Sequence, residues 1–432
     1  MRRKLAMVLV CLCLTMTGMT TAAAVQPLER FIVVLQPGPD PVENVAQELA
    51  QQHGGVVGFV YRYALRGFSV TLPAPAVEGL RHNPHVAYIE PDVQLFVTQT
   101  GGQEVPTGID RIDADVNPPV SPMQVDVAII DTGVYIGQTS SGQARSHLDL
   151  NLQQVTDCTT AIFYPLFGGC DGSGNVQDEN GHGTHVAGIA AALDNGIGSI
   201  GTAPGAVLWS LKALDANGSG FVGGIIAAID TVAAYANEIE VVNMSFGFEG
   251  QVAAMDEAIA NAVNLGVVFV AAAGNGGIDG ATFSPGNHPD VITVSALADF
   301  DGLPGGLGAE TCRPDLDDTF ADFSNFGSTV EIAAPGVCIF STFLNDGYET
   351  LSGTSMATPY VTGAVARLIA QSGFNPTNRT EVMQLRSMLV ASGAPQDSVC
   401  GFTGDPDPTP EPLLYMNSTL FGGTGVCNES PP

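Results

Sequence analysis

After about residue 100, short apolar runs alternate with alanine-rich stretches, and this alternation strongly constrains the fold. The apolar runs are typical of β-strands and the alanine-rich stretches of helices, as in "VDVAIID" and, further along, "VAGIAAALD". Chains with this pattern place their strands in a parallel sheet covered by helices. The sequence therefore predicts an α/β domain with a parallel sheet flanked by helices.

A second, smaller module is predicted before residue 100. Residues 31–97 contain alternating apolar segments such as "RFIVVLQP" and "RGFSVTLP", which indicate a small α+β module, and the polar joint "TQTGGQEVPTG" follows it. With 432 residues, the chain is too long for one ordinary core, so two or three domains are expected. The proline-rich and acidic "GDPDPTPEP" near the end predicts an irregular surface extension.

The first residues have the features of a secretory signal peptide. Basic residues at positions 2–4 precede an apolar segment from Leu5 to about Leu14, and small residues follow at positions 22–24. A membrane anchor is the alternative, but this apolar segment is shorter than the ~20 residues that span a bilayer. We expect residues 1–24 to be removed and the protein to be secreted, extracellular and free of the membrane.

The cysteines agree with export. Of the 8 cysteines, Cys11 and Cys13 lie in the expected leader, and an even number remains, which favours disulfides in an oxidising compartment. A zinc cluster is the alternative, but the remaining cysteines have no C-x-x-C spacing. Proximity along the chain favours three pairs: Cys158 with Cys170, Cys312 with Cys338, and Cys400 with Cys427.

The chain is strongly acidic. Lys and Arg number 14 against 44 for Asp and Glu, so the formal net charge is −30, and Lys4 and Lys212 are the only lysines. Nucleic acid, itself polyanionic, is therefore not expected as a partner.

Asp131 ends the apolar run from Val125 to Ile130. An acid in this place lies at the carboxyl end of a strand, the edge where open α/β sheets gather ligands and catalytic groups. Alternatively, Asp131 only turns the chain. The "DTG" could also suggest an aspartic protease, but that chemistry needs two carboxylates, and without a second such motif it would require a symmetric dimer.

The segment "NGHGTHVAG" contains His182 and His185. A zinc site would need further ligands, and the H-E-x-x-H arrangement is missing. Glycines on both sides of His182 let backbone and substrate approach it closely, whereas we expect His185 to be a hydrogen-bonded interior imidazole. The other histidines are scattered without ligand spacing: His53, His82, His85, His147 and His288.

A buried helix is predicted to begin near Ser355. Apolar residues recur with helical spacing through "SMATPYVTGAVARLIA". Pro359 is tolerated in a first turn, where N–H groups lack intrahelical partners, so Ser355 is placed at the positive end of the helix. That end favours a developing oxyanion. The alternative role for Ser355 is a simple N-cap.

Taken together, "IIDTGV", "NGHGTHVAG" and "SGTSMATP" resemble the three signature blocks of subtilisin-type serine proteases, close to their proteinase K-like members. The resemblance implies that Ser355 is the nucleophile, His182 its general base and Asp131 the carboxylate that orients the imidazole. A serine hydroxyl needs such a base because it is a weak nucleophile at neutral pH. Asn275, after "VVFVAAAG", resembles the oxyanion-hole asparagine, with the Ser355 N–H as its partner.

The resemblance also implies a groove for extended peptides and a primary specificity pocket. The residues expected to bind substrate are Asn217, Gly218, Ser219, Gly220, Ser245, Phe246, Gly247, Ala272, Ala273, Gly274 and Phe283. Phe283 stands where the family usually has a small residue, which leaves the preferred side chain open, with apolar residues favoured. Tyr360 stands where many relatives have histidine, and we expect altered packing there.

A structural calcium site is implied by the same resemblance, and no organic cofactor is. Its expected ligands are Gln103, Asp149, Leu193, Asn195, Ile197 and Ser199. Oxygen donors in a glycine-bearing loop suit calcium better than a transition metal.

The first module resembles the propeptide inhibitor of these proteases, in "FIVVLQ", "ALRGFSVTLP" and "VAYIEPD". We therefore expect a signal peptide at 1–24, an inhibitor and folding-assistant propeptide at 25–100, a subtilisin-like catalytic domain at 101–395 and an extension at 396–432. Cleavage is expected near residues 97–102.

The resulting hypothesis is a secreted, monomeric serine endopeptidase that forms an acyl-enzyme intermediate and matures by removing its own propeptide. Its expected partners are protein or peptide substrates and its own propeptide, with neither nucleic acid nor membrane. Two alternatives remain: a catalytically silent peptide-binding homologue, and a metal-dependent hydrolase that uses the histidine pair.

Overall fold

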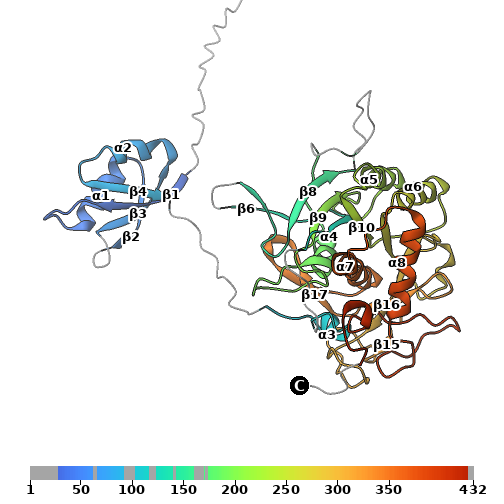
Figure 1. Cartoon of the computed structure of the whole chain (residues 1–432). Helices are drawn as coiled ribbons and strands as arrows, with labels where there is room; N and C mark the ends of the chain where they lie inside the picture. The colour runs from blue at the N-terminus through green and yellow to red at the C-terminus, as the bar shows by residue number, and fades with distance from the viewer. Residues whose placement is uncertain are drawn as a thin grey trace, which may run out of the picture. The chain divides into compact units, whose positions relative to one another are not determined.

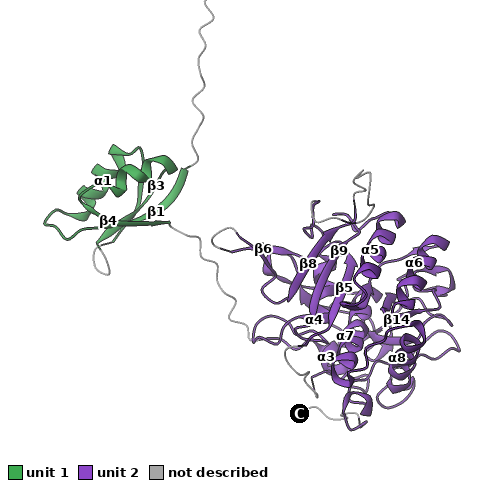
Figure 2. Cartoon of the chain, turned by 45° about the horizontal axis from the view of Figure 1, so that its top comes forward, with its two compact units in different colours: residues 1–98 green, residues 99–432 purple. Residues whose placement is uncertain are grey.

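The computed structural model describes residues 28–61, 66–91, 103–115, 123–139, 143–159, 170 and 174–426. The chain divides into two compact units, residues 1–98 and 99–432 (Figure 2). The expected leader at residues 1–24 and the expected cleavage region at residues 97–102 lie outside the described residues.

The smaller unit is an antiparallel sheet with helices, which confirms the α+β prediction. Its strand order is β2-β3-β1-β4. Alternate residues of β1, including Val33 and Leu35, are buried against Phe68 and Leu72 of β3 and the apolar side of α1. The elements are β1 (Leu28–Leu35), α1 (Val42–Gln52), β2 (Val56–Tyr61), β3 (Gly67–Pro73), α2 (Val77–Arg81) and β4 (Val86–Pro91).

The larger unit is built on a mostly parallel sheet flanked by helices, as predicted (Figure 1). The strand order is β15-β14-β12-β10-β5-β9-β8, and β16 also pairs with β14. The strands are β5 (Asp126–Asp131), β8 (Leu152–Asp157), β9 (Val207–Lys212), β10 (Ile239–Met244), β12 (Val268–Ala272), β14 (Val291–Ala298), β15 (Thr319–Phe320) and β16 (Ile332–Pro335). The helices are α3 (Thr107–Arg111), α4 (His182–Ala191), α5 (Val222–Ala234), α6 (Ala253–Asn264), α7 (Thr354–Ser372) and α8 (Arg379–Ser392).

The central strands are buried on both faces. Every residue of β12 and β14 is buried, and so are all but the first of β5. Strands covered on both sides read as continuous apolar runs, which is why the sequence pattern was informative. Short antiparallel pairs complete the unit: β6 (Ile136–Gln138) with β7 (Ala144–Ser146), β11 (Phe248–Glu249) with β13 (Phe283–Ser284), and β17 (Ile339–Thr342) with β18 (Tyr348–Leu351).

The last residues are irregular, as expected, but they are not confined to the surface. Phe402 and Leu413 are buried and pack with Leu297 of β14 and Phe320 of β15. Leu413 also bridges to Ala333 of β16 through the backbone. The prediction of a surface extension was wrong in this respect, because a few apolar residues between the prolines are enough to anchor the segment.

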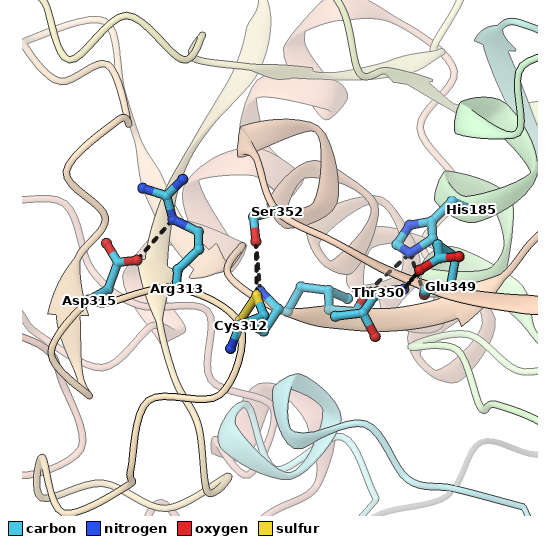
Figure 3. Close-up of a disulfide and its surroundings, with 9 residues drawn as sticks. His185, Cys312, Arg313, Asp315, Glu349, Thr350 and Ser352 are labelled. Carbon is cyan, nitrogen blue, oxygen red and sulfur yellow. Dashed lines mark hydrogen bonds and ion pairs between the residues drawn. A yellow bond between two sulfur atoms is a disulfide. The ribbon is translucent and has the colours of Figure 1, made fainter.

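Two of the expected disulfides are formed. Cys158 pairs with Cys170, and Cys312 pairs with Cys338 (Figure 3). Cys400 is also in a disulfide, while Cys427 lies outside the described residues. In the described part of the chain, no helix is long and apolar enough to cross a membrane.

Helices α4 and α7 pack directly on each other, and a glycine makes their close approach feasible. A Cβ added to Gly363 of α7 would lie 2.6 Å from the Cβ of Thr202 and 2.9 Å from the carbonyl oxygen of Ala190 in α4. Gly223, near the start of α5, has no such neighbour within 4 Å.

We predict that Gly363→Ala lowers the free energy of unfolding by about 1–3 kcal/mol, because the new methyl group meets backbone that cannot move aside. Gly223→Ala is the matched control, and it should be neutral or stabilising by roughly 0.5–1 kcal/mol, since alanine is the better helix former. Guanidinium unfolding of both variants measures the difference. Equal stability of the two variants would contradict the packing described.

Candidate active site

Three neighbouring parallel strands end at one edge of the sheet and deliver polar residues there. β5 pairs with β10, and β10 pairs with β12, all parallel. Asp131 ends β5, Ser245 directly follows β10, and Asn275 follows shortly after β12. Parallel pairing brings the carboxyl ends of the three strands to the same edge of the sheet, so these three residues lie on one side although they are far apart in sequence.

Asp131 and His182 are joined by a hydrogen bond. His182 is the first residue of α4, and its Nδ1 lies 2.8 Å from Oδ1 of Asp131. Asp131 is fully buried, whereas the His182 side chain is 26% exposed. Gly183 permits this approach, because a Cβ there would lie 3.1 Å from the Cβ of Asp131 and still closer to the carbonyl of Gly133. The carboxylate thus fixes the imidazole ring, while the rest of the ring stays accessible to solvent.

The electrostatics of this pair favour a charged imidazole. Burial lowers the pKa of His182, but the charge and hydrogen bond of Asp131 outweigh this effect, so the pKa lies above its ordinary value. Asp131 therefore suits the site to stabilise a proton that His182 accepts. The buried Lys212, at the end of β9 beside the pair, donates from Nζ to the carbonyl of Thr132, at 2.7 Å.

Asp178 is a positioning residue that was not predicted from the sequence. It is buried, and its two carboxylate oxygens accept hydrogen bonds from the N–H groups of Gly181 and Thr184 at the start of α4. It also accepts from the hydroxyl of Thr132 at 2.9 Å. An acid shortly before a helix start is a typical N-terminal partner, and that pattern could have identified it. Asp178 fixes the entry of the helix that carries His182.

His185 is an interior residue, in agreement with the expectation from the sequence. It is buried, and its Nε2 lies 3.1 Å from the carbonyl of Ile339. The same atom lies 3.0 Å from the carbonyl of Glu349 (Figure 3). Burial lowers the pKa of His185 to about 4. Among the described residues, the one group of three metal-binding side chains close enough to share an ion consists of aspartates, without either histidine.

Ser355 and Ser245 exchange two hydrogen bonds. The Ser355 hydroxyl donates to the Ser245 carbonyl at 2.9 Å, and the Ser245 hydroxyl donates to the Ser355 carbonyl at 2.8 Å. Pro359 explains the second bond, because in a regular helix the N–H four residues on would reach that carbonyl, and proline has none. The exchange ties the start of α7 to the end of β10.

The prediction that Pro359 lies in the first turn of the helix was wrong. α7 begins at Thr354, so Pro359 lies within the helix rather than in its first turn. Ser245 compensates for the missing donor, and it is itself held by a buried chain. Asn243 donates to the Ser245 hydroxyl at 2.9 Å, and Thr362 donates to Asn243 at 2.9 Å.

Asn275 is oriented by Thr354. Its Oδ1 accepts from the N–H of Thr354 at 2.8 Å and from the Thr354 hydroxyl at 2.9 Å. With the oxygen so engaged, the Nδ2 group is left to donate to another acceptor near Ser355. Thr354 is fully buried and was not singled out from the sequence.

The expected specificity pocket contains the ring of Phe283. A Cβ on Gly247 would lie 2.6 Å from Cζ of Phe283, and a Cβ on Gly274 would lie 2.9 Å from its Cδ1. β11 and β13 pair so that Phe283 is opposite Glu249. The ring therefore lies against both segments that follow β10 and β12, where a substrate side chain was expected to enter.

The other expected groove residues are distributed as follows. Ser245, Ala272 and Ala273 are buried, and Phe246 is half-buried. Asn217 to Gly220 form an exposed turn, which Asp215 holds by accepting hydrogen bonds from backbone N–H groups.

The residues expected to hold calcium meet in one place. Gln103 donates from Nε2 to the carbonyls of Leu193, at 2.7 Å, and Ser199, at 3.1 Å. Asn195 donates from Nδ2 to Oδ1 of the buried Asp149, at 3.0 Å. Two carbonyls and a carboxylate thus converge on two amide side chains.

This donor set fits calcium. Burial raises the pKa of Asp149 to about 6. The two amide nitrogens face the carbonyls and the carboxylate, while the amide oxygens accept from backbone N–H groups, Gln103 from Gly196 and Asn195 from Ile197. A rotation of the two amides would present oxygen instead of nitrogen to a cation, and oxygen is the ligand that calcium prefers.

The chain is similar to known proteins over both units. A family model described as "Subtilase family" matches residues 123–402, and one described as "Peptidase inhibitor I9" matches residues 30–98. The chain is 36% identical to "Alkaline protease" of Alkalihalobacillus alcalophilus over 323 residues, which is 74% of this chain and 72% of that protein. It is 34% identical to "Subtilisin E" of Bacillus subtilis (strain 168) over 330 residues, 75% of this chain and 76% of that protein.

We predict that Asp131→Asn lowers the pKa of His182, because the substitution removes the negative charge that raises it while burial, which lowers it, remains. Titration of the histidine ring resonances by NMR measures the shift. The resonance of His288 serves as the internal control, since burial lowers its pKa and neither Asp131 nor His182 is among the charges that act on it. An unchanged His182 pKa in the variant would show that the Asp131 charge does not act on the ring.

Proposed function

Because the chain belongs to the subtilase family of serine endopeptidases, we propose that Asp131, His182 and Ser355 carry out its peptide-bond hydrolysis. The observation that carries this assignment is the 2.8 Å hydrogen bond between the buried Asp131 carboxylate and His182. This bond engages Nδ1, so Nε2 of the partly exposed imidazole is left to act as a base.

In the proposed reaction, the Ser355 hydroxyl rotates away from the Ser245 carbonyl and attacks the peptide carbonyl carbon. His182 accepts the hydroxyl proton, and Asp131 stabilises the imidazolium that results. His182 then gives this proton to the leaving amine as the peptide C–N bond breaks, which leaves an acyl-enzyme on Ser355. Water, deprotonated by His182, hydrolyses the ester and restores the serine.

Asn275 is proposed to stabilise the oxyanion. Its oxygen is held by Thr354, so the Nδ2 group is the part free to donate to the developing negative charge. The N–H of Ser355 at the start of α7 supplies the second donor, and the positive end of the helix favours the charge.

The two-unit organisation supports a protease precursor with its own inhibitor. We propose that residues 1–24 direct secretion, that 25–100 assist folding and block the enzyme, and that the enzyme removes them itself. The catalytic domain at 101–395 and the extension at 396–432 would then form the extracellular, monomeric protease. The net charge of −30 supports the absence of a nucleic-acid partner.

A calcium ion is proposed at the Gln103 and Asp149 site. The carbonyls of Leu193, Ile197 and Ser199, the carboxylate of Asp149 and the amide oxygens of Gln103 and Asn195 would hold it. When bound, the ion supplies positive charge that links the start of the catalytic unit to the loop after α4.

Phe283 is proposed to restrict the specificity pocket to small side chains. Its ring lies against Gly247 and Gly274. These two glycines border the space expected to receive the substrate side chain that precedes the cleaved bond. Glycine and alanine leave the ring in place, whereas a large apolar side chain would have to displace it. The enzyme would then cleave after small residues.

We predict that Ser355→Ala abolishes self-processing and lowers kcat by about 10⁶-fold, the size of the effect of removing the nucleophile in subtilisin. Electrophoresis of the purified chain and peptide hydrolysis measure the two effects. Ser387→Ala, which changes an exposed serine of α8, is the matched control and should process normally. A Ser355→Ala chain that still removes its leader would exclude the proposed mechanism. The two alternatives give different results. If chelation abolishes hydrolysis and a serine-directed phosphonylating reagent does not, the metal-dependent alternative is favoured. If the native chain stays unprocessed and inactive, the peptide-binding alternative is favoured.

We predict that Phe283→Gly raises kcat/KM for peptides with phenylalanine before the cleaved bond relative to those with alanine, by roughly 10-fold or more. The reason is that the vacated ring space becomes available to a large side chain. Matched peptide substrates that differ only at that residue measure the ratio. If wild type already prefers phenylalanine, or the ratio does not change, Phe283 does not set the pocket depth.

A further inference from the structure

A long connection between β14 and β15 carries a group of aspartates that the catalytic proposal does not use. It spans residues 299–318 and is tied to the body of the unit by the disulfide between Cys312 and Cys338. Figure 3 shows this anchor, with Ser352 beside the disulfide and Arg313 directed at Asp315. The connection is therefore held in place at its middle.

Three carboxylates of this connection converge. One oxygen from each of Asp299, Asp301 and Asp317 lies within 4.8 Å of the others. Oxygens that bind one calcium ion at about 2.3–2.6 Å lie no more than roughly 5 Å apart, so this spacing matches a shared ion. Asp299 and Asp317 are buried, and Asp301 is exposed, which gives an ion a path from solvent.

Asp299 has an oxygen without a partner. Its side chain is fully buried, and Oδ1 accepts from the N–H of Gly302 at 3.1 Å, whereas Oδ2 has no hydrogen-bond donor at bonding distance among the described residues. Asp317 differs, because its two oxygens accept from the N–H groups of Phe300 and Gly308, each at 2.8 Å. A buried carboxylate oxygen left bare is costly, and a bound ion is one of the features that satisfies it.

The charges around the group are unbalanced. Arg111 is the cation that faces it, and its Nε lies 2.5 Å from Asp318 and 3.9 Å from Asp299. The same guanidinium also donates to backbone carbonyls of residues 400 and 401. Asp110 adds a further carboxylate, since a Cβ on Gly302 would lie 3.3 Å from its Oδ2. In the described part of the chain, Asp299, Asp301, Asp317 and Asp318 thus share Arg111 as the cationic neighbour.

We propose that Asp299, Asp301 and Asp317 bind a calcium ion at a second site, separate from the Gln103 and Asp149 site. The donors are all carboxylate oxygens, and such ligands suit calcium better than the transition metals that favour nitrogen or sulfur ligands. The ion would neutralise the acidic group and join the two ends of the connection, because Asp299 and Asp301 precede Cys312 and Asp317 follows it. The proposal goes beyond the enzymatic function and does not depend on catalysis.

The test is calcium titration by isothermal calorimetry on the full chain carrying Ser355→Ala, which prevents self-digestion, after removal of bound ions with EDTA. Asp149→Asn in the same chain removes the carboxylate of the first site, so the remaining heat reports the second. We expect one calcium ion to bind per Asp149→Asn chain. Asp301→Asn should then weaken this binding by about 10-fold or more.

Glu310→Gln is the matched control, because it removes one exposed negative charge from the same connection without touching the three aspartates. It should leave the calcium affinity unchanged. Circular dichroism verifies that each variant is folded, and Asp301 is suited to substitution because its side chain is exposed. The same comparison of Asp301→Asn with Glu310→Gln, made with Asp149 intact, remains decisive if Asp149→Asn does not fold. Equal titrations of these two variants would overturn the proposal, as would a folded Asp149→Asn chain that binds no calcium.

Discussion

The parallel pairing of β5, β10 and β12 is the constraint on which the catalytic unit depends. These strands are far apart in sequence, yet their pairing sends Asp131, Ser245 and Asn275 to a single edge. The register matters as much as the order, since a shift by one residue would turn each buried side chain to the opposite face. The strand order and register of the sheet thus determine where these residues lie, and the loops add to that arrangement.

A second dependence links the helix of Ser355 to this sheet. Pro359 removes one backbone donor from α7, and the carbonyl left behind is satisfied by Ser245 rather than by the helix. A buried carbonyl without a partner costs about 1–3 kcal/mol, so the proline effectively requires the serine. Asn243 and Thr362 complete a buried polar chain whose members support one another.

The sequence predicted the features that depend on local pattern. The parallel sheet, the α+β module and the interior position of His185 follow from runs of apolar or small residues. Thr354 and the Ser245 exchange were missed, because each acts through contacts between segments distant in sequence. Asp178 was missed although its position shortly before a helix start is a local pattern. The burial of Phe402 and Leu413 was missed because prolines and acids dominate the composition around them. Local periodicity does not encode such tertiary contacts.

The position of Lys212 has a practical consequence for handling the enzyme. Lys212 is 2% exposed, and its ammonium group donates to the Thr132 carbonyl. The chain's only other lysine, Lys4, lies in the expected leader. A mature chain would therefore offer amine-directed reagents its α-amino terminus and no accessible ε-amine. Coupling to a resin or a dye through amines would attach every molecule at the same point, in one orientation.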